Sequence, residues 1–431
     1  MTDVHADWRV VGFGNYAWFR ASSHVHAASL AGLIVDLLPD DFPLPDMDVR
    51  ADGVRVGVSA PNERAGDTER AGVLMQAISD AAGTLGLASD PSVLQEMRLQ
   101  VDSAAPASVK SFWRTALDYR EVDADTLADP LRRRPAIRFE QSNQTRPLRN
   151  RIHVDAGYSG PISDSVQALK AGGGRDTFTC EWYATLADLD GNEVDLVPGG
   201  VLGEGSTADW SVLFGAMACY PGVAPRQAAE LAAASARLVD DAGIPLMIDL
   251  RPEAVVFDSG KDQWEEVAGF VDLASAVQAA ARAAGHTADN SRVRFVQAGI
   301  DAVDIPSVRE FWRTVLGYVH APNSGYTDLY DPRQLNPVVF FQPMEATEVE
   351  RRRQRNRIHV ELLMPSDQLQ TRADAAVAAG GRILLEEERS PDRIRLADPE
   401  GSEVVLRERA HPGAQLHGFE ERDGYRSPPN W

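Results

Sequence analysis

The sequence has few cysteines and no long apolar run, and both scarcities narrow the classes of protein to which it can belong. Its two cysteines, Cys180 and Cys219, cannot build a disulfide framework, and neither has a CxxC partner for zinc. No apolar run approaches the roughly 20 residues that a membrane-spanning helix needs. The N-terminal segment is acidic where a secretory signal would be basic. We therefore expect a cytoplasmic protein without a membrane partner.

Positive charge is also scarce. The 431 residues include 43 lysines and arginines against 64 aspartates and glutamates, which gives a formal net charge of −21. This excess repels a phosphate backbone, so we expect no nucleic-acid partner. Two arginine runs, residues 132–134 and 351–353, are interpreted as parts of solvated connections between strands, with an anion-binding role as the alternative.

A large internal repeat is present. The hexapeptide RNRIHV occurs at residues 149–154 and 355–360, SFWRTALDY (111–119) matches EFWRTVLGY (310–318), and LADLDGNEVDL (186–196) matches LADPEGSEVVL (396–406). The motifs keep the same order in both copies, so the chain has the plan A-B-A′-B′. The predicted domains are 1–95 for A, 96–200 for B, 205–290 for A′ and 292–410 for B′, followed by a tail at 411–431.

The patterning predicts an α+β fold in every unit. In unit A, residues 26–38 and 71–86 have helical spacing, and the segments around the Asp52-Gly53 turn alternate like strands. Unit A therefore reads as β-α-β-β-α, an antiparallel sheet with two helices on one face. Each B unit reads as two β-α-β-β-β modules.

The duplication itself predicts an internal assembly. A small sheet has edge strands that are safest when they are covered, and a chain with two copies can pair them within itself. We predict that A joins A′ edge to edge across a pseudo-twofold axis. The two halves would then form an intramolecular pseudo-dimer, which is compatible with a monomeric chain.

Units B and B′ resemble the vicinal oxygen chelate superfamily, which includes glyoxalases, extradiol dioxygenases and bleomycin-resistance proteins. The likeness is closest to the glyoxalase-like branch. It rests on Phe112-Trp113, residues 150–154 and residues 188–193 in the first copy, and on Phe311-Trp312, residues 356–360 and residues 398–403 in the second. The resemblance implies that paired modules curl their sheets around a cleft in which a divalent metal ion often sits.

Units A and A′ more loosely resemble pterin carbinolamine dehydratases, whose turn before the paired strands carries His-His-Pro. Residues 43–45 read Pro-Leu-Pro and residues 243–245 read Gly-Ile-Pro, so both histidines are missing. Dehydration needs positioned acid and base groups. We expect scaffolds that lack this chemistry, with His24 and His26 as the alternative source of histidines.

The two repeated histidines are the main site candidates. Side chains alternate along a strand, so His153 shares one face with Asp155, and His359 shares one with Glu361. The resemblance places the other ligand positions at Arg98, Glu140 and Asp195 in B and at Gln297, Gln342 and Val405 in B′. The better metal set is Glu140, His153 and Asp195, so we expect at most one divalent ion. The alternative is a hydrogen-bonded histidine in a metal-free cleft.

Two functions follow from the resemblance. The first is binding of a small organic ligand in the glyoxalase-like clefts, as in sequestration or resistance proteins, through His153, Asp155, Trp182, His359, Glu361 and Glu403. The second is a metal-dependent lyase, isomerase or dioxygenase-type enzyme at unit B, with Glu140 or Glu193 moving a proton. Glu193 and Glu403 could instead pair with an arginine of RNR. A pterin carbinolamine dehydratase is a weaker third reading.

Overall fold

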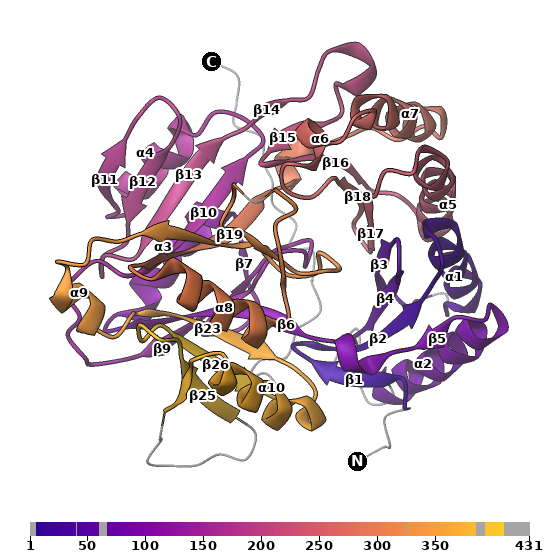
Figure 1. The fold of residues 1–431 in the computed structure, drawn as a ribbon. Coiled ribbons are helices and arrows are strands. Elements are labelled where there is room, and N and C mark those ends of the chain that lie inside the picture. The colour runs from indigo at the N-terminus through magenta and orange to yellow at the C-terminus, as the bar shows by residue number, and fades with distance from the viewer. Residues whose placement is uncertain (1–5, 40, 60–66, 324, 385–392, 409–431) are drawn as a thin grey trace.

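The computed structural model describes residues 6–39, 41–59, 67–323, 325–384 and 393–408. Three sheets organise the molecule (Figure 1). One large sheet is built from units A and A′, and two eight-stranded sheets are built from units B and B′. No helix in the described ranges is long and apolar enough to cross a membrane.

The sheet of the A units has ten strands in the order β1-β2-β4-β3-β17-β18-β16-β15-β14, with β5 beside β2. Unit A supplies β1 (Trp8–Val11), β2 (Gly14–Arg20), α1 (His24–Leu37), β3 (Asp46–Arg50), β4 (Gly53–Val58), α2 (Asp67–Thr84) and β5 (Ala88–Ser89). Unit A′ supplies β14 (Gly200–Val201), β15 (Ser211–Leu213), β16 (Gly215–Pro221), α5 (Pro225–Ala242), β17 (Met247–Arg251), β18 (Ala254–Asp258), α6 (Gln263–Glu266) and α7 (Phe270–Ala283).

The predicted joining of A and A′ is confirmed. Strand β3 pairs antiparallel with β17, and Asp48 lies opposite Asp249 at the centre of the pairing. Helices α1, α2, α5 and α7 line one side of this sheet (Figure 1), and their apolar residues share one core with it. The pairing gives the backbone groups of both edge strands hydrogen-bond partners inside the chain.

The B units form two sheets of the predicted β-α-β-β-β modules. Unit B contains β6 (Glu96–Ser103), α3 (Pro106–Leu117), β7 (Arg120–Glu121), β8 (Thr126–Ala128), β9 (Ile137–Gln141), β10 (Ile152–Tyr158), α4 (Ser163–Ala171), β11 (Arg175–Thr179), β12 (Ala184–Ala187) and β13 (Glu193–Pro198). Unit B′ contains β19 (Phe295–Ala302), α8 (Ile305–Leu316), β20 (Val319–His320), β21 (Leu329–Tyr330), β22 (Val339–Pro343), α9 (Val349–Arg353), β23 (Ile358–Leu363), α10 (Ser366–Ala378), β24 (Arg382–Ile383), β25 (Arg393–Ala397) and β26 (Glu403–Arg407).

The two B units exchange modules. Sheet I has the order β11-β12-β13-β10-β19-β22-β21-β20, and sheet II has the order β24-β25-β26-β23-β6-β9-β8-β7. Each sheet therefore takes one module from each repeat, joined by β10 with β19 in sheet I and by β23 with β6 in sheet II. Our expectation that the modules of one unit share one cleft is wrong for this reason. Local patterning defines the strands, but it does not define which copy each strand pairs with.

One apolar core holds the exchanged modules together. It takes one face of each sheet, with Val154 and Val360 among its fully buried residues, and it includes side chains of α3, α4, α8 and α10. The tryptophans of the repeated FWR segments anchor these helices. Trp113 Nε1 donates to Asp188 Oδ2 and Trp312 Nε1 donates to Asp398 Oδ2, each at 3.0 Å. We call the opposite surface of each sheet its polar face.

The RNR residues of the repeated hexapeptide connect the two copies. Asn356 Oδ1 accepts from the backbone N–H of Arg151 at 3.0 Å, and Asn150 Oδ1 accepts from the N–H of Arg357 at 2.8 Å. Arg151 Nη1 also donates to the carbonyl of Glu400 at 2.9 Å. These reciprocal bonds give the repeated hexapeptide a structural role, in addition to supplying a histidine to each sheet.

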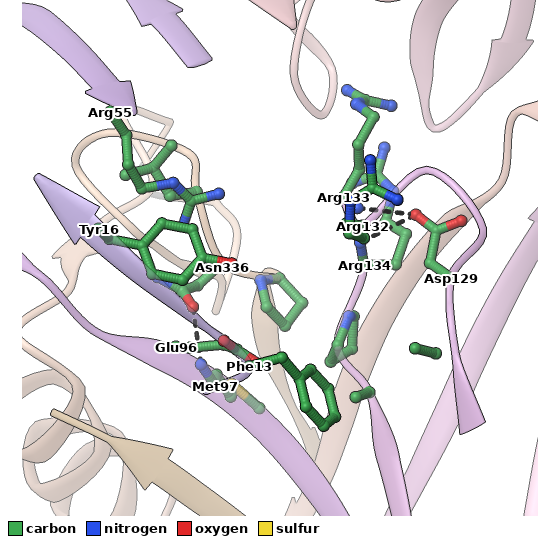
Figure 2. A pocket seen from close by; sticks show the side chains of 15 residues that line it. Phe13, Tyr16, Arg55, Glu96, Met97, Asp129, Arg132, Arg133, Arg134 and Asn336 are labelled. Atoms are coloured by element: carbon green, nitrogen blue, oxygen red, sulfur yellow. Dashed lines mark hydrogen bonds between the residues drawn. The ribbon is translucent and has the colours of Figure 1, made fainter. Parts of the chain in front are cut away.

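The first arginine run is not a solvated connection. Arg133 donates to Asp249 at 2.6 Å and to Asp258 at 2.8 Å, and Arg134 donates to Asp258 at 2.9 Å. Their backbone N–H groups donate to Asp129 (Figure 2). The run therefore fixes unit B on the sheet of the A units through ion pairs. In the second run Arg351 is buried and Arg353 is exposed.

Candidate metal centre

Strand β10 presents its polar residues as the alternation predicts. Ile152 and Val154 lie in the shared core, whereas His153 and Asp155 lie on the polar face of sheet I. Both polar side chains are nevertheless buried. An imidazole and a carboxylate are thus held next to each other with little contact to water.

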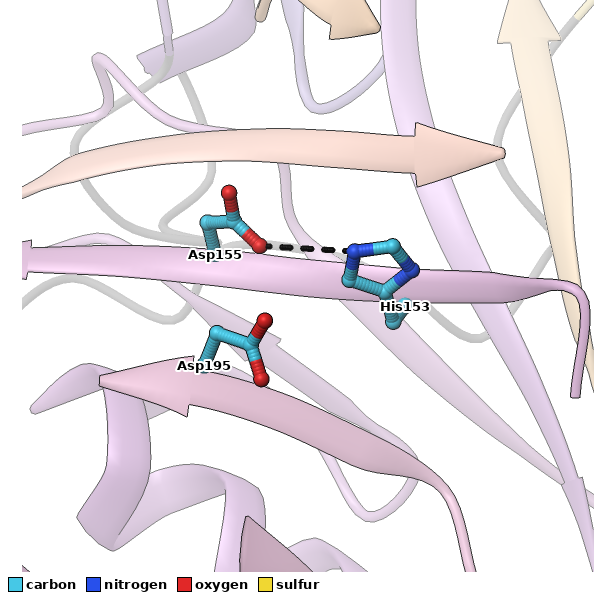
Figure 3. Close-up of side chains that lie close together, drawn as sticks. All are labelled: His153, Asp155 and Asp195. Atoms are coloured by element: carbon cyan, nitrogen blue, oxygen red, sulfur yellow. Dashed lines mark ion pairs between the residues drawn. The ribbon is translucent and has the colours of Figure 1, made fainter. Parts of the chain in front are cut away.

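Asp195 of β13 completes a compact group with these two residues. It lies beside Asp155 in the parallel pairing of β10 with β13. Ligand atoms of His153, Asp155 and Asp195 all lie within 4.8 Å of one another (Figure 3). His153 Nε2 is 3.6 Å from Asp155 Oδ1. Imidazole nitrogen and carboxylate oxygen are common ligands of divalent transition metals.

Gln297 of the other repeat adds an acceptor to this group. It lies opposite Asp155 in the antiparallel pairing of β10 with β19, and its Nε2 donates to Asp155 Oδ2 at 2.8 Å. In the described part of the chain, Asp155 Oδ1 and Gln297 Oε1 are buried without a hydrogen-bond partner. Buried acceptors normally have partners. A cation bound by His153, Asp155 and Asp195 would give Asp155 Oδ1 a partner, so this donor set fits a metal ion.

The ionisation of Asp155 reflects the same surroundings. Burial raises the pKa of its carboxyl group to about 6, and the carboxylate of Asp195 adds to the rise. Two neighbouring carboxylates with little water favour the protonated form of one of them. A bound cation would reverse this preference by favouring the charged form.

Gly299 leaves the room that the imidazole of His153 occupies. A Cβ atom at this position would lie 2.4 Å from His153 Nε2 and 2.6 Å from the ring of Phe340. The Phe340 ring in turn meets the imidazole edge to face, with centroids 5.5 Å apart. Our sequence reasoning missed Gly299. A comparison of the two repeats could have found it, because the equivalent residue in sheet II is Gln100.

The histidines of the two sheets are oriented differently. His359 of sheet II places its Nε2 at 3.1 Å from Asp102 Oδ2. His153 instead faces the equivalent residue, Asp301, with its Nδ1 at 3.9 Å, which leaves Nε2 directed to Asp155. A metal-binding histidine usually donates its second ring N–H to a carboxylate or carbonyl, and Asp301 is near Nδ1 without being hydrogen-bonded to it.

Several predicted site residues do not join this group. Glu140 lies on β9 of sheet II and is ion-paired with Arg138 at 3.6 Å, so it cannot act with His153. Glu193 accepts from Arg149 at 2.6 Å. Glu403 accepts two bonds from Arg355, at 2.6 and 2.9 Å. The two repeated glutamates therefore have the alternative role, pairing with the first arginine of RNR.

The aromatic surroundings also differ from expectation. The side chain of Trp182 is 72% exposed, so it forms no wall over the group. Burial raises the pKa of the Tyr183 hydroxyl, and the charge of Asp195 adds to the rise. Lys261 of unit A′ lies 5.6 Å from the Phe340 ring centroid. Unit A′ therefore supplies a cation at the border of sheet I.

The other candidate positions carry no comparable group. Among the described residues, His153, Asp155 and Asp195 form the one group of three potential ligand side chains. In sheet II, Val405 takes the place of Asp195, and Glu361 accepts from Arg407 at 3.1 Å. Gln342 is exposed.

The histidines of unit A are structural. His24 Nδ1 lies 3.1 Å from Asp240 of α5, and its Nε2 lies 3.1 Å from the carbonyl of Leu246. His26 Nε2 lies 2.9 Å from the carbonyl of Leu85. His24 therefore links the two A units, and burial lowers its pKa.

Comparison with known proteins gives a match for both B units. Residues 98–197 and 297–406 match the family described as the glyoxalase-like domain. No curated protein matches the chain. Glyoxalase I from Zea mays is 11% identical, with a TM-score of 0.38 over 73% of this chain and 93% of that one. The cppA protein from Streptococcus pneumoniae is 6% identical, with a TM-score of 0.32 over 73% of this chain and 97% of that one.

A further similar structure covers a smaller part of the chain. The fosfomycin resistance protein FosX from Listeria monocytogenes, complexed with Mn(II) and a dihydroxypropylphosphonic acid, is 12% identical with a TM-score of 0.22. The match covers 26% of this chain and 86% of that one. The likeness of the B units to the glyoxalase-like domain therefore rests on the matched sequence segments.

Proposed function

We propose that sheet I, which is built from the two segments that match the glyoxalase-like domain, binds one divalent metal ion together with a small organic ligand in the cytoplasm. The observation that carries this proposal is the buried group of His153, Asp155 and Asp195 beside two unpartnered oxygens. The proposed ligands are these three side chains and Gln297. When bound, the ion would supply positive charge to polarise oxygen atoms of the small molecule.

Binding without chemistry is the function that we favour. A general base must be able to reach the proton that it removes. Glu193 is held by Arg149, and Asp301 is held by Arg351. The carboxylates next to the proposed ligand set are therefore engaged in ion pairs. This supports a sequestration or resistance type of protein.

An enzyme of the lyase, isomerase or dioxygenase type is the second candidate. Asp155 favours it, because burial raises the pKa of this carboxyl to about 6, which is suited to proton transfer near neutral pH. This role would require Asp155 Oδ1 to accept a proton from the ligand. Asp195, His153 and Gln297 would then hold the ion.

For the A units we infer a scaffolding role. Their likeness to pterin carbinolamine dehydratases stays a prediction. The positions of the two missing histidines are Pro43 and Leu44, and Leu44 is buried in the core of unit A. Ion pairs such as Arg133 with Asp249 bind the sheet to unit B.

The test is metal analysis of protein purified without chelator, followed by calorimetric titration with Mn²⁺ and Zn²⁺. We expect one ion per chain. His153→Ala should abolish binding, and the matched variant His359→Ala should retain it, because His359 is hydrogen-bonded to Asp102. Two ions per chain, or loss of binding in the His359 variant, would contradict the assignment.

A further inference from the structure

Sheet II carries three arginines at positions that hold uncharged residues in sheet I. Arg98 of β6, Arg138 of β9 and Arg407 of β26 correspond to Gln297, Phe340 and Val197. The equivalence follows from the strand registers, because each residue occupies the same place relative to the repeated histidine. The polar face of sheet II therefore carries three guanidinium groups that sheet I lacks, and each has a carboxylate neighbour, Glu96, Glu140 or Glu361.

These guanidinium groups surround one buried carboxylate. Arg98 lies opposite Glu361 in the pairing of β23 with β6. Arg407 Nη1 donates to Glu361 at 3.1 Å, and Arg138 Nη1 lies 3.6 Å from the same carboxylate. The geometry thus already brings two guanidinium groups to one carboxylate oxygen. Planar guanidinium groups are well suited to bind carboxylate and phosphate.

The arginines have more donors than this carboxylate uses. A guanidinium group has five N–H donors. In the described part of the chain, the hydrogen bonds of these three groups are the bond from Arg407 to Glu361 and one from Arg98 Nε to Glu96 at 2.5 Å. Arg98 Nη2 and Arg407 Nε are buried without a partner there. Unpaired buried donors of this kind call for an acceptor.

A pocket on the side of unit A adjoins two neighbours of Arg98. The ring of Phe13 lies 3.8 Å from the guanidinium carbon of Arg98, and Glu96 is the ion partner of Arg98. Both Phe13 and Glu96 line a pocket of about 570 Å³, part of which is open solvent (Figure 2). The pocket therefore reaches two direct neighbours of Arg98, but the buried guanidinium group of Arg98 does not line it.

We propose that the polar face of sheet II binds a small oxyanion, a carboxylate or phosphate group, through Arg98, Arg138 and Arg407. This site is separate from the metal centre, and it uses a different part of each repeat. The ligand oxygens would take the N–H donors that Glu96, Glu140 and Glu361 leave unused. The two sheets would then bind ligands of opposite charge.

The experiment is calorimetric titration of metal-free full-length protein with inorganic phosphate and, separately, with acetate, at low ionic strength. Binding of phosphate alone assigns a phosphate site, and binding of acetate assigns a carboxylate site. Arg407→Val and Arg138→Phe, which copy sheet I, should each weaken binding by about tenfold or more. Arg226→Gln, at an exposed ion pair on α5, should leave it unchanged.

A second variant should change the affinity in the opposite direction. A folding defect cannot cause such a gain in affinity. Glu361→Gln removes the carboxylate that competes for Arg407 and Arg138, so oxyanion binding should become tighter. The proposal is overturned if wild-type protein binds neither probe, or if the variants at Arg138 and Arg407 bind as wild type does.

Discussion

Gly299 decides where the imidazole of His153 can lie, since any side chain there would overlap the ring. Gly299→Gln copies Gln100 of sheet II and should turn His153 away from Asp155. We expect the affinity for Mn²⁺ or Zn²⁺ to fall by about tenfold to 100-fold, the range typical of lost support for a ligand. Calorimetric titration measures it.

The reverse change in sheet II is the matched control. Gln100→Gly should leave metal affinity at the wild-type value, because His359 already has Asp102 as its partner. Unchanged affinity in the Gly299 variant would show that the imidazole position does not matter for binding.

Asp155 should make the metal-free protein sensitive to pH. Its folded-state pKa is raised to about 6, so its stabilising contribution is complete at acidic pH and is lost as the pH rises through 6. A rise of about two pKa units corresponds to roughly 2–3 kcal/mol. The variant Asp155→Asn should not show this loss of stability with rising pH.

The measurement is the melting temperature of both metal-free proteins between pH 4 and pH 7. The value for Asp155→Asn minus that for wild type should increase with pH. Metal affinity of the wild type should fall below pH 6, because protons compete with the ion. A difference that stays constant over this range would contradict the raised pKa.

Some of the site could be predicted from single residues. Alternation along a strand placed His153 and Asp155 on one face, and the register confirms it. The sequence predicted Gln297 as a candidate ligand beside His359. In the structure Gln297 lies opposite Asp155, in the other sheet. The prediction that Glu140 acts with His153 is wrong for the same reason, because Glu140 lies in sheet II. Strand patterns specify faces, whereas the choice between two nearly identical partner modules depends on contacts distant in sequence.

At the scale of elements, the exchange of modules depends on the bonds between the two hexapeptides. Asn356→Ala would leave the N–H of Arg151 without its acceptor in a buried site. An unpaired buried donor costs about 1–3 kcal/mol, so we expect a clearly lower melting temperature.

The central joining of β3 with β17 was predictable because both are edge strands of duplicated sheets.

The control for this variant is Gln354→Ala. Gln354 also bonds to the other copy, through Leu148, but these bonds lie at the surface. Water can replace them, so the melting temperature should change little. An equal loss in both variants would indicate that burial of the asparagine is not what matters.

At the scale of the whole molecule, neither half is complete. A chain ending at Gly200 would expose β3, β6 and β10, whose partners β17, β23 and β19 all lie in the second half. Exposed strand edges favour association. We expect this fragment to dimerise or aggregate, while the full chain is monomeric in light scattering. A monomeric first half with cooperative unfolding would contradict this expectation.

The exchange of modules also has a genetic consequence. Sheet I and sheet II each contain one module from either repeat, so their different polar faces arise from changes made in both halves of the gene. Splitting the gene between the repeats would give two products that each carry half of both sites. A homodimer of either product could rebuild only one kind of sheet, made from the first and the second module of a single repeat. Two unlike sites therefore require both repeats, either joined in one chain or associated as two products.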